Sequence, residues 1–349
     1  MKLRSVLVLV AAVLALACAA KKPPIVELPT PVVTEGGAPV FGISTVPRLV
    51  PAPGLRDYIE AADAVNGAGA RASFESATWS DLDSAAGLAK LTDSLNSAGK
   101  RGYTVLLTIK VLDTTVRVTP ADLSALAFDA SAVKQRFHAL IDTLAPSLGA
   151  VRYLSIGNEV DVYLGSHPAT LDAYARFYAD AVSYVHTRLP GVLVGVTSTY
   201  SGVSGMSVLN AHSDVVVMTY YPLGPKFAPR PPSTARVDVP KMLDIAGTKP
   251  LVLQEVGYPS ATRLSSSESA QAAFVTEVLA AWKAAGARIP MLNWFALGDF
   301  TPELCATLSS YYSLGGDQNF AAYLCTLGLR RVDGVAKPSW QAFLDATKS

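Results

Sequence analysis

Short apolar runs rich in β-branched residues alternate with longer amphipathic stretches along most of the chain. Such runs are typical of buried strands, and apolar positions three and four residues apart are typical of helices. The pattern predicts eight strands, at residues 40–43, 71–75, 104–109, 151–156, 193–197, 215–220, 251–254 and 291–295. The clearest helical patterns lie at residues 81–98, 130–144, 171–189, 267–285 and 339–347.

The predicted strands are mostly apolar on both faces, and one marker position per strand recurs at intervals of 22 to 48 residues. Strands of this kind are buried between two layers. Their number and spacing predict one (β/α)8 barrel, a TIM barrel of the α/β class, as a single domain at residues 39–349. The shortest interval predicts a short fifth helix or a loop. A doubly wound open sheet is the rival fold, but no glycine-rich phosphate loop follows an early strand.

The first 38 residues follow a different pattern. Lys2 and Arg4 precede an apolar stretch at residues 6–17, which is short for a bilayer span and typical of a signal peptide. The small residues before Cys18 resemble the lipobox of bacterial lipoproteins. The resemblance implies that residues 1–17 are removed and that Cys18 is lipidated, while the proline-rich residues 18–38 predict an extended tether. An ordinary secretory signal with a stray cysteine is the alternative.

A lipid on Cys18 predicts an exported protein anchored to a bacterial membrane, in the periplasm or at the cell surface. In a Gram-negative host, Ala19 favours the outer membrane, because lipoproteins retained at the inner membrane carry Asp at that position. An oxidising compartment also favours a disulfide between Cys305 and Cys325, which lie 20 residues apart, over two buried thiols.

Composition excludes several classes of function. The chain has 29 Lys and Arg against 28 Asp and Glu, so there is no basic field to attract nucleic acid. Hydrophobic residues make up 50% of the chain, but they come in short runs, which excludes a polytopic membrane protein. The four histidines are scattered without zinc-ligand spacing, so no metal site is expected. We also expect that the protein has no cofactor and is a monomer.

Two glutamates follow directly after apolar runs. Glu159 ends the segment SIGNE after the fourth predicted strand, and Glu255 ends the segment LQE after the seventh. The carboxyl ends of barrel strands carry the catalytic groups. Two carboxyl groups there suit glycoside hydrolysis, because one can protonate the leaving oxygen while the other attacks the anomeric carbon. Either glutamate alone would more often be a solvated rim residue, but the pair indicates catalysis.

These segments resemble clan A of the retaining glycoside hydrolases. In that clan an Asn-Glu pair after the fourth strand carries the acid/base, and the glutamate after the seventh strand is the nucleophile. The segment QEVGYPS at residues 254–260 is similar to the nucleophile segment of β-1,3-glucanases and endo-β-1,4-galactanases. TYYP at residues 219–222 resembles the sixth-strand end of the galactanases. Val256 departs from these families, which usually have a small polar residue there.

The resemblance implies a role for each matching residue. Glu159 is implied as general acid and then base, Glu255 as nucleophile, and Asn158 as a ligand of the sugar 2-hydroxyl group. Tyr220, or failing that Tyr221, is implied as the residue that orients the nucleophile.

Trp294, in the eighth predicted strand, is implied as the ring that stacks on a pyranose. Three further residues near strand ends are candidates for lining sugar subsites: Glu75, Lys110 and Trp79. Structural salt bridges are the alternative role for Glu75 and Lys110. Tyr311 and Tyr312 either stack on a bound sugar or pack over loops or the hydrophobic core.

Together these patterns predict a retaining glycoside hydrolase that cleaves a β-linked oligo- or polysaccharide by double displacement. Carboxyl groups about 5 Å apart would be consistent with retention. The alternative is a non-catalytic surface lipoprotein whose hydrolase-like barrel binds a glycan or a protein partner. A nucleotide-dependent α/β enzyme is poorly supported, because no phosphate-binding motif is visible.

Overall fold

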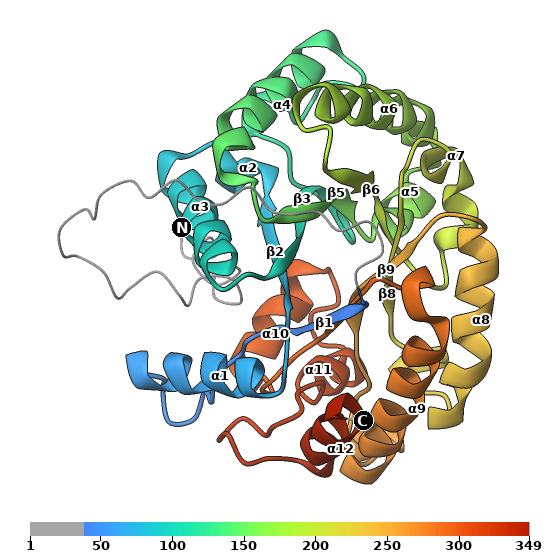
Figure 1. The fold of residues 1–349 in the computed structure, drawn as a ribbon. Coiled ribbons are helices and arrows are strands. Elements are labelled where there is room, and N and C mark those ends of the chain that lie inside the picture. Colours follow the sequence, from blue (N-terminus) through green and yellow to red (C-terminus); the bar gives the residue numbers. More distant parts are fainter. Residues whose placement is uncertain (1–37, 349) are drawn as a thin grey trace, which may run out of the picture.

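The computed structural model describes residues 38–348. The predicted signal peptide, the predicted lipidation site Cys18 and the tether before Ala38 lie outside these residues. The described chain forms a ring of parallel strands surrounded by helices, which is a (β/α)8 barrel (Figure 1). The predicted fold is therefore confirmed.

The described chain fills eight strand positions in the ring, because β6 and β7 share the fifth position on either side of Val196. In ring order the strands are β1 (Val40–Ile43), β2 (Ala72–Thr78), β3 (Thr104–Asp113), β5 (Val151–Asn158), β6 (Leu193–Gly195) with β7 (Thr197–Thr199), β8 (Val216–Tyr220), β9 (Leu251–Val256) and β10 (Met291–Trp294). A short strand, β4 (Val116–Arg117), pairs antiparallel with the end of β3. Every predicted strand region contains a strand, but β2 and β3 run further than predicted.

Helices cover the outside of the ring. They are α1 (Leu55–Gly67), α2 (Trp79–Leu82), α3 (Ala85–Lys100), α4 (Ser131–Leu144), α5 (Val160–Ser166), α6 (Leu171–Arg188), α7 (Ser207–Asn210), α8 (Ala235–Ala246), α9 (Glu268–Ala285), α10 (Pro302–Tyr311), α11 (Gln318–Leu324) and α12 (Pro338–Lys348). The four-residue α7 follows the fifth strand position, as the short interval predicted.

Apolar side chains are buried on both sides of the strands. Inside the ring, Leu106, Val217 and Met291 belong to one cluster. Outside it, Leu107 of β3 belongs to a second cluster with Phe137 of α4 and other helix residues. Burial on both faces explains why the strands read as continuous apolar runs and the helices as amphipathic stretches.

One seam of the ring lacks a ladder. A parallel ladder joins β1 to β10, but within residues 38–348 none joins β1 to β2. The Arg71 amide donates one hydrogen bond to the Phe41 carbonyl at 3.0 Å. A Cβ on Gly42 would lie 2.7 Å from the Ala72 carbonyl oxygen, so the two strands are in close contact at that point. The seam is therefore held by packing more than by hydrogen bonds.

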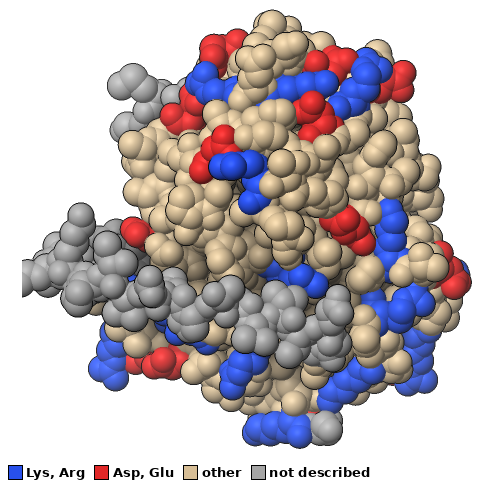
Figure 2. All heavy atoms as spheres, turned by 45° about the horizontal axis from the view of Figure 1, so that its top comes forward, with Lys and Arg blue, Asp and Glu red and all other residues tan. Residues whose placement is uncertain are grey.

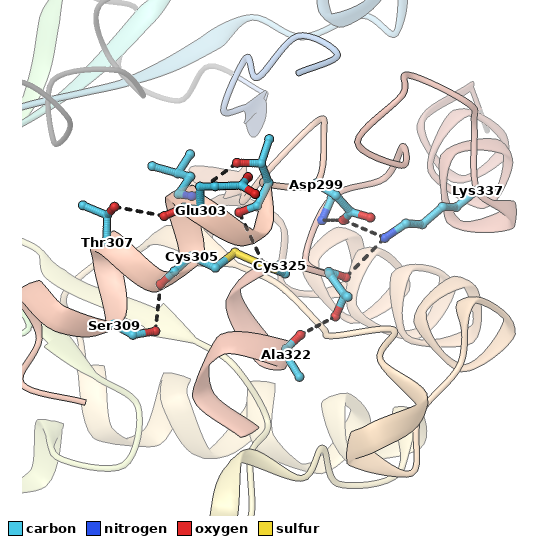
Figure 3. The surroundings of a disulfide bond; sticks show 12 residues. Asp299, Glu303, Cys305, Thr307, Ser309, Ala322, Cys325 and Lys337 are labelled. Carbon is cyan, nitrogen blue, oxygen red and sulfur yellow. Dashed lines mark hydrogen bonds and ion pairs between the residues drawn. A yellow bond between two sulfur atoms is a disulfide. The ribbon is translucent and has the colours of Figure 1, made fainter. Parts of the chain in front are cut away.

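The segment after β10 carries α10 and α11, and a disulfide between Cys305 and Cys325 joins them (Figure 3). The expected disulfide is present, with its Cα atoms 5.9 Å apart. Lys337 fixes the base of the segment, because its Nζ donates to Asp299 at 2.8 Å and to Ser260 at 3.0 Å. This segment matters for the site described below.

The surface carries charges of both signs close together. Basic and acidic side chains lie side by side along the upper edge of the face in Figure 2. Ion pairs on the outer helices, such as Arg136 with Asp83 at 2.8 Å and Arg188 with Asp142 at 2.6 Å, account for part of this mixing. Among the described helices, none is long and apolar enough to cross a membrane.

Candidate active site

A cavity of about 1240 Å³ opens at the carboxyl ends of the strands, and both Glu159 and Glu255 line it. This is the face of a (β/α)8 barrel where catalytic groups gather. The cavity lining also includes residues of α1 and α3, at the outer face of β2. In residues 38–348, no cluster of His, Cys, Asp and Glu side chains is arranged to hold a metal ion.

The end of β5 presents Glu159 to the cavity through an unusual local backbone. Gly157 has φ +98°, and a Cβ at that position would lie 2.4 Å from the Tyr174 hydroxyl oxygen. Glu159 itself has left-handed dihedrals of 46° and 46°. Its Oε1 accepts a hydrogen bond from Thr219 at 2.7 Å, and its Oε2 accepts one from Thr114 at 2.9 Å. Two hydroxyl donors thus fix the carboxyl group from two different strand ends.

Glu255 lies in β9, in register with Thr219 of β8, the residue that binds Glu159. Its Oε2 accepts a hydrogen bond from the Tyr221 hydroxyl at 2.7 Å. Gly257 makes this contact possible, since a Cβ there would lie 2.6 Å from the Tyr221 ring. The register of β8 and β9 therefore brings the two glutamates onto one cavity.

The two carboxyl groups have different electrostatic surroundings. Burial, and then the charge of Glu255, raises the pKa of Glu159 to about 7. Burial also raises the pKa of Glu255, but the Tyr221 hydroxyl and the positive charge of Lys110 act against this rise. A carboxyl group with a pKa near neutrality suits a general acid, while one beside a cation and a hydroxyl donor is the one to ionise first.

The amide of Asn158 is held in one orientation. Its Nδ2 donates to Asp113 at 2.9 Å, and its Oδ1 accepts from Gln254 at 2.7 Å. The Gln254 orientation is fixed in turn, because its Oε1 accepts hydrogen bonds from Thr108 and Thr197, both at 2.6 Å. Since an amide nitrogen carries two protons, one Nδ2 proton remains for a ligand.

Lys110, near the end of β3, lines the cavity and pairs with Asp113 at 3.2 Å. Burial alone would lower its pKa, but the negative charges of Asp113, Glu255 and Glu159 together raise it. The ammonium group therefore stays charged beside the two glutamates. The salt bridge that we weighed as the alternative role is present, and it does not remove Lys110 from the cavity.

Tyr220 was predicted to orient the nucleophile, and the structure contradicts this. Its side chain is fully buried, and its hydroxyl donates to Asp238 at 3.0 Å on the outer side of β8. Tyr221, the second choice, is the residue that contacts Glu255. Successive side chains of a strand face opposite sides, so a register error of one residue exchanges the core and the cavity.

The two tryptophans proposed as sugar-binding rings are core residues. Trp294 is fully buried between Phe274 and Phe343, whose ring centroids each lie 6.1 Å away. Trp79 is 1% exposed and packs edge-on against Phe137. The first aromatic side chain after β10 that lines the cavity is Phe295, one residue beyond Trp294.

Glu75 is also misplaced by the sequence prediction. Because β2 continues to Thr78, Glu75 lies in the middle of the strand and not at its end. It accepts hydrogen bonds from Ser73 and, at 2.5 Å, from Ser94 of α3, which places it on the outer face of β2. Burial raises its pKa. It is among the residues that line the cavity, but from the outer face of β2 and not from the strand end.

Sequence reasoning missed several residues of the site. Thr219 was part of the TYYP motif but had no assigned role, and Thr114 follows directly after β3. Asp113 lay beyond the predicted end of that strand. Tyr323, which lines the cavity and meets the Tyr221 ring edge-on at 5.4 Å, comes from α11. Nothing in the sequence shows that Phe295 and not Trp294 faces the cavity, and nothing in it places Tyr323 there.

Solved structures of sugar-cleaving enzymes share this fold. Exo-β-1,4-mannosidase Op5Man5 from Opitutaceae bacterium strain TAV5 matches with a TM-score of 0.68 and 19% identity, over 89% of this chain and 59% of that chain. GH5_18 from Streptomyces cattleya, in complex with GlcNAc, matches with a TM-score of 0.69 and 17% identity, over 90% and 80%. The Ignisphaera aggregans GH53 catalytic domain matches with a TM-score of 0.59 and 16% identity, over 80% and 86%.

These likenesses extend over most of the present chain, which spans less than two thirds of the length of the mannosidase. At such identities they show a common (β/α)8 fold. No protein-family profile matches the chain, and no curated protein matches it.

Proposed function

We propose that the chain is a retaining glycoside hydrolase that cleaves a β-linked glycan, with Glu159 as acid/base and Glu255 as nucleophile. One observation carries the proposal: two buried carboxyl groups share one cavity at the catalytic face, and their surroundings differ as the two roles require. The names of the enzymes with the same fold agree with it.

In the first step, a Glu255 oxygen attacks the anomeric carbon while the bond to the leaving oxygen breaks. The Glu159 proton passes to that oxygen, so a neutral alcohol departs and a glycosyl ester of Glu255 remains. In the second step, the Glu159 carboxylate takes a proton from water. The water oxygen bonds to the anomeric carbon, the ester bond breaks, and both carboxyl groups return to their starting states.

Neighbouring residues support these steps. The Tyr221 hydroxyl, whose pKa is raised by burial and then by the charge of Glu255, stays protonated and holds the nucleophile. The free Nδ2 proton of Asn158 can bind the sugar 2-hydroxyl group, a contact that strengthens in the transition state. Lys110 favours the ionised form of Glu255, and Phe295 offers an apolar surface to a sugar ring.

The test is hydrolysis of aryl β-glycosides and of β-linked mannan, glucan and galactan oligosaccharides, with Glu159→Gln and Glu255→Gln in parallel. Glu60→Gln, a change at an exposed helix position, is the matched control. We expect activity on at least one substrate, a loss of about 10³-fold or more in both active-site variants, and products that keep the β-anomer.

Activity that survives in Glu255→Gln would rule out the nucleophile assignment, and inverted products would rule out double displacement. If no substrate is hydrolysed but a glycan binds, the chain is the non-catalytic binding barrel that we weighed as the alternative.

We also propose that the protein is exported and anchored by a lipid on Cys18, because of the N-terminal signal and the cysteine that follows it. In a bacterial host, labelled palmitate should be incorporated into the wild-type chain and not into Cys18→Ser. The variant should also leave the membrane fraction. Equal labelling of both chains would contradict the anchor.

A further inference from the structure

The segment from α10 to α11, which we call the clasp (Pro302–Leu324), is a folded unit and not a simple loop. The disulfide joins Cys305 in α10 to Cys325, directly after α11 (Figure 3). Phe300, Phe320 and Leu324 bury their side chains in the apolar cluster of this region. A cross-linked, packed segment keeps its shape when a ligand enters, so it can act as a wall.

The clasp is attached to the barrel on two sides of the cavity. At one end, the Tyr311 hydroxyl donates to Asp113 at the end of β3, at 3.0 Å. At the other, Phe227 after β8 stacks on Tyr323 with centroids 5.8 Å apart. In ring order, β9, β10, β1 and β2 lie between these two attachments. The clasp therefore spans the rim of the cavity over these strands.

The roles proposed for Glu159 and Glu255 determine which end of the substrate lies under the clasp. The acid must contact the leaving oxygen, so the leaving group lies on the side of Glu159, over β5 and β7. On that side the cavity is lined by Val162, Thr199 and Ser201, outside the clasp. The sugar that is attacked extends the opposite way, toward β10, and β10 stands across the ring from β5.

The wall above that sugar carries hydroxyl groups. Tyr312 and Tyr323 both line the cavity. Burial, and then the charges of nearby acidic groups including Glu159 and Glu255, raises the pKa of each phenol, so both stay protonated beside the pair. Phenol groups there can bind the outer hydroxyl groups of a terminal sugar, whereas a chain that continued would meet the aromatic rings.

We infer that the clasp closes the non-reducing side of the cavity, so that the enzyme removes single sugars from that end of a glycan. The inference rests on the proposed hydrolase function and adds to it the class of substrate: a free non-reducing terminus.

The test compares β-1,4-linked manno-, gluco- and galacto-tetraoses with the same tetraoses blocked by a 4,6-O-acetal on the non-reducing terminal ring. On whichever tetraose is cleaved, the wild type should release a monosaccharide as its first product. The blocked form should react at least about 100-fold more slowly, because the acetal has no room under the clasp. Larger first products, or blocked chains cleaved at a similar rate, would overturn the inference.

A binding measurement separates this inference from the proposed function. If neither a tetraose nor any substrate of the wider panel is hydrolysed, the hydrolase proposal fails, and calorimetry of tetraose binding to Glu159→Gln still tests whether the clasp closes this side. Free tetraose that binds while the blocked form does not supports a closed end in a binding protein. Equal binding of both forms, or binding of neither, rejects the closed end.

Opening the clasp is the complementary experiment. Cys305→Ala, Cys325→Ala and Tyr311→Phe combined in one chain should raise the rate on the blocked tetraose at least about tenfold relative to the free form. Tyr184→Phe is the matched control, since it removes a tyrosine–aspartate hydrogen bond of 2.8 Å on the outer helices. An unchanged ratio in a folded triple variant would show that the clasp does not set the preference. The wild-type comparison decides the matter if that variant does not fold.

Discussion

Tyr221 and Tyr220 are adjacent residues with opposite tasks. Tyr221 donates to the buried carboxyl group of Glu255, while Tyr220 donates to Asp238, which is 2% exposed. A hydrogen bond to a charged group contributes about 1.5–3 kcal/mol, so Tyr221→Phe should lower kcat by about 10- to 100-fold. Tyr220→Phe should leave kcat unchanged and reduce the unfolding free energy by about 1–2 kcal/mol. Steady-state kinetics and urea unfolding measure both, and the reverse pattern would contradict the assignment.

The pH dependence of kcat/KM reports the same site. Glu159 must be protonated to act as the acid, and its pKa of about 7 predicts that activity falls above neutrality. The Thr219 hydrogen bond lowers this pKa, so Thr219→Val should move the alkaline limb to higher pH. Thr276→Val, on the outer surface of α9, is the control. If the alkaline limb of Thr219→Val does not move, a group other than Glu159 sets that limb.

Glu159 also affects stability. Its pKa of about 7 in the folded protein lies above the ordinary value of 4.5, so the folded state binds the proton more tightly than the unfolded state. The contribution of Glu159 to the unfolding free energy is therefore fully present below pH 4.5 and is lost as the pH rises through 7. Glu159→Gln should therefore be more stable than the wild type by about 3 kcal/mol at pH 8 and equally stable at pH 4. Urea unfolding at both pH values tests this. If the difference in unfolding free energy between the two proteins does not change with pH, the pKa of Glu159 is not raised in the folded protein.

At the scale of elements, the ends of β8, β9 and β10 fit together because Gly257 lacks a side chain. A Cβ there would approach the Tyr221 ring to 2.6 Å and the Phe295 carbonyl oxygen to 2.9 Å. Gly257→Ala should displace Tyr221 and lower kcat at least about tenfold. Gly149→Ala, where nothing lies within 4 Å of an added Cβ, should leave kcat unchanged. Equal activity of both variants would show that the strand ends tolerate the shift.

Element prediction succeeded where periodicity was strong. The apolar runs of β3, β5 and β9 report burial on both faces, and the pattern located them within a few residues. Their ends were less predictable, since β3 continues through Lys110 to Asp113 by pairing with β4 and β5. That extension moved Asp113 into the site, and the extension of β2 removed Glu75 from it.

For the molecule as a whole, the ring should be least protected at its one seam. Residues 73–78 of β2 pair with β3 on one side, and no ladder joins them to β1 in the described chain. By contrast, β9 pairs with β8 and β10 on its two sides. Native-state hydrogen exchange should therefore be faster at the amides of β2 that face β1 than at any amide of β9. Uniform protection of both strands would show that the seam is closed by other means.

The barrel, the positions of its strands and the pair formed by Glu159 and Glu255 could be predicted from the sequence. These features depend on local patterns, because burial between two layers selects continuous apolar runs and a strand end is marked by the first polar residues after one. The disulfide partners were also readable, since residues 38–348 contain two cysteines and export favours their pairing.

The sequence did not show which side chain of each neighbouring pair faces the cavity, because this depends on how the strands are assembled. A strand alternates its side chains between two faces, so Tyr221 and Phe295 could not be distinguished from Tyr220 and Trp294 without the register. The Tyr311–Asp113 contact joins residues 198 positions apart. Such a contact exists because the closed ring brings the segment after β10 within reach of the end of β3, and no local pattern records that closure.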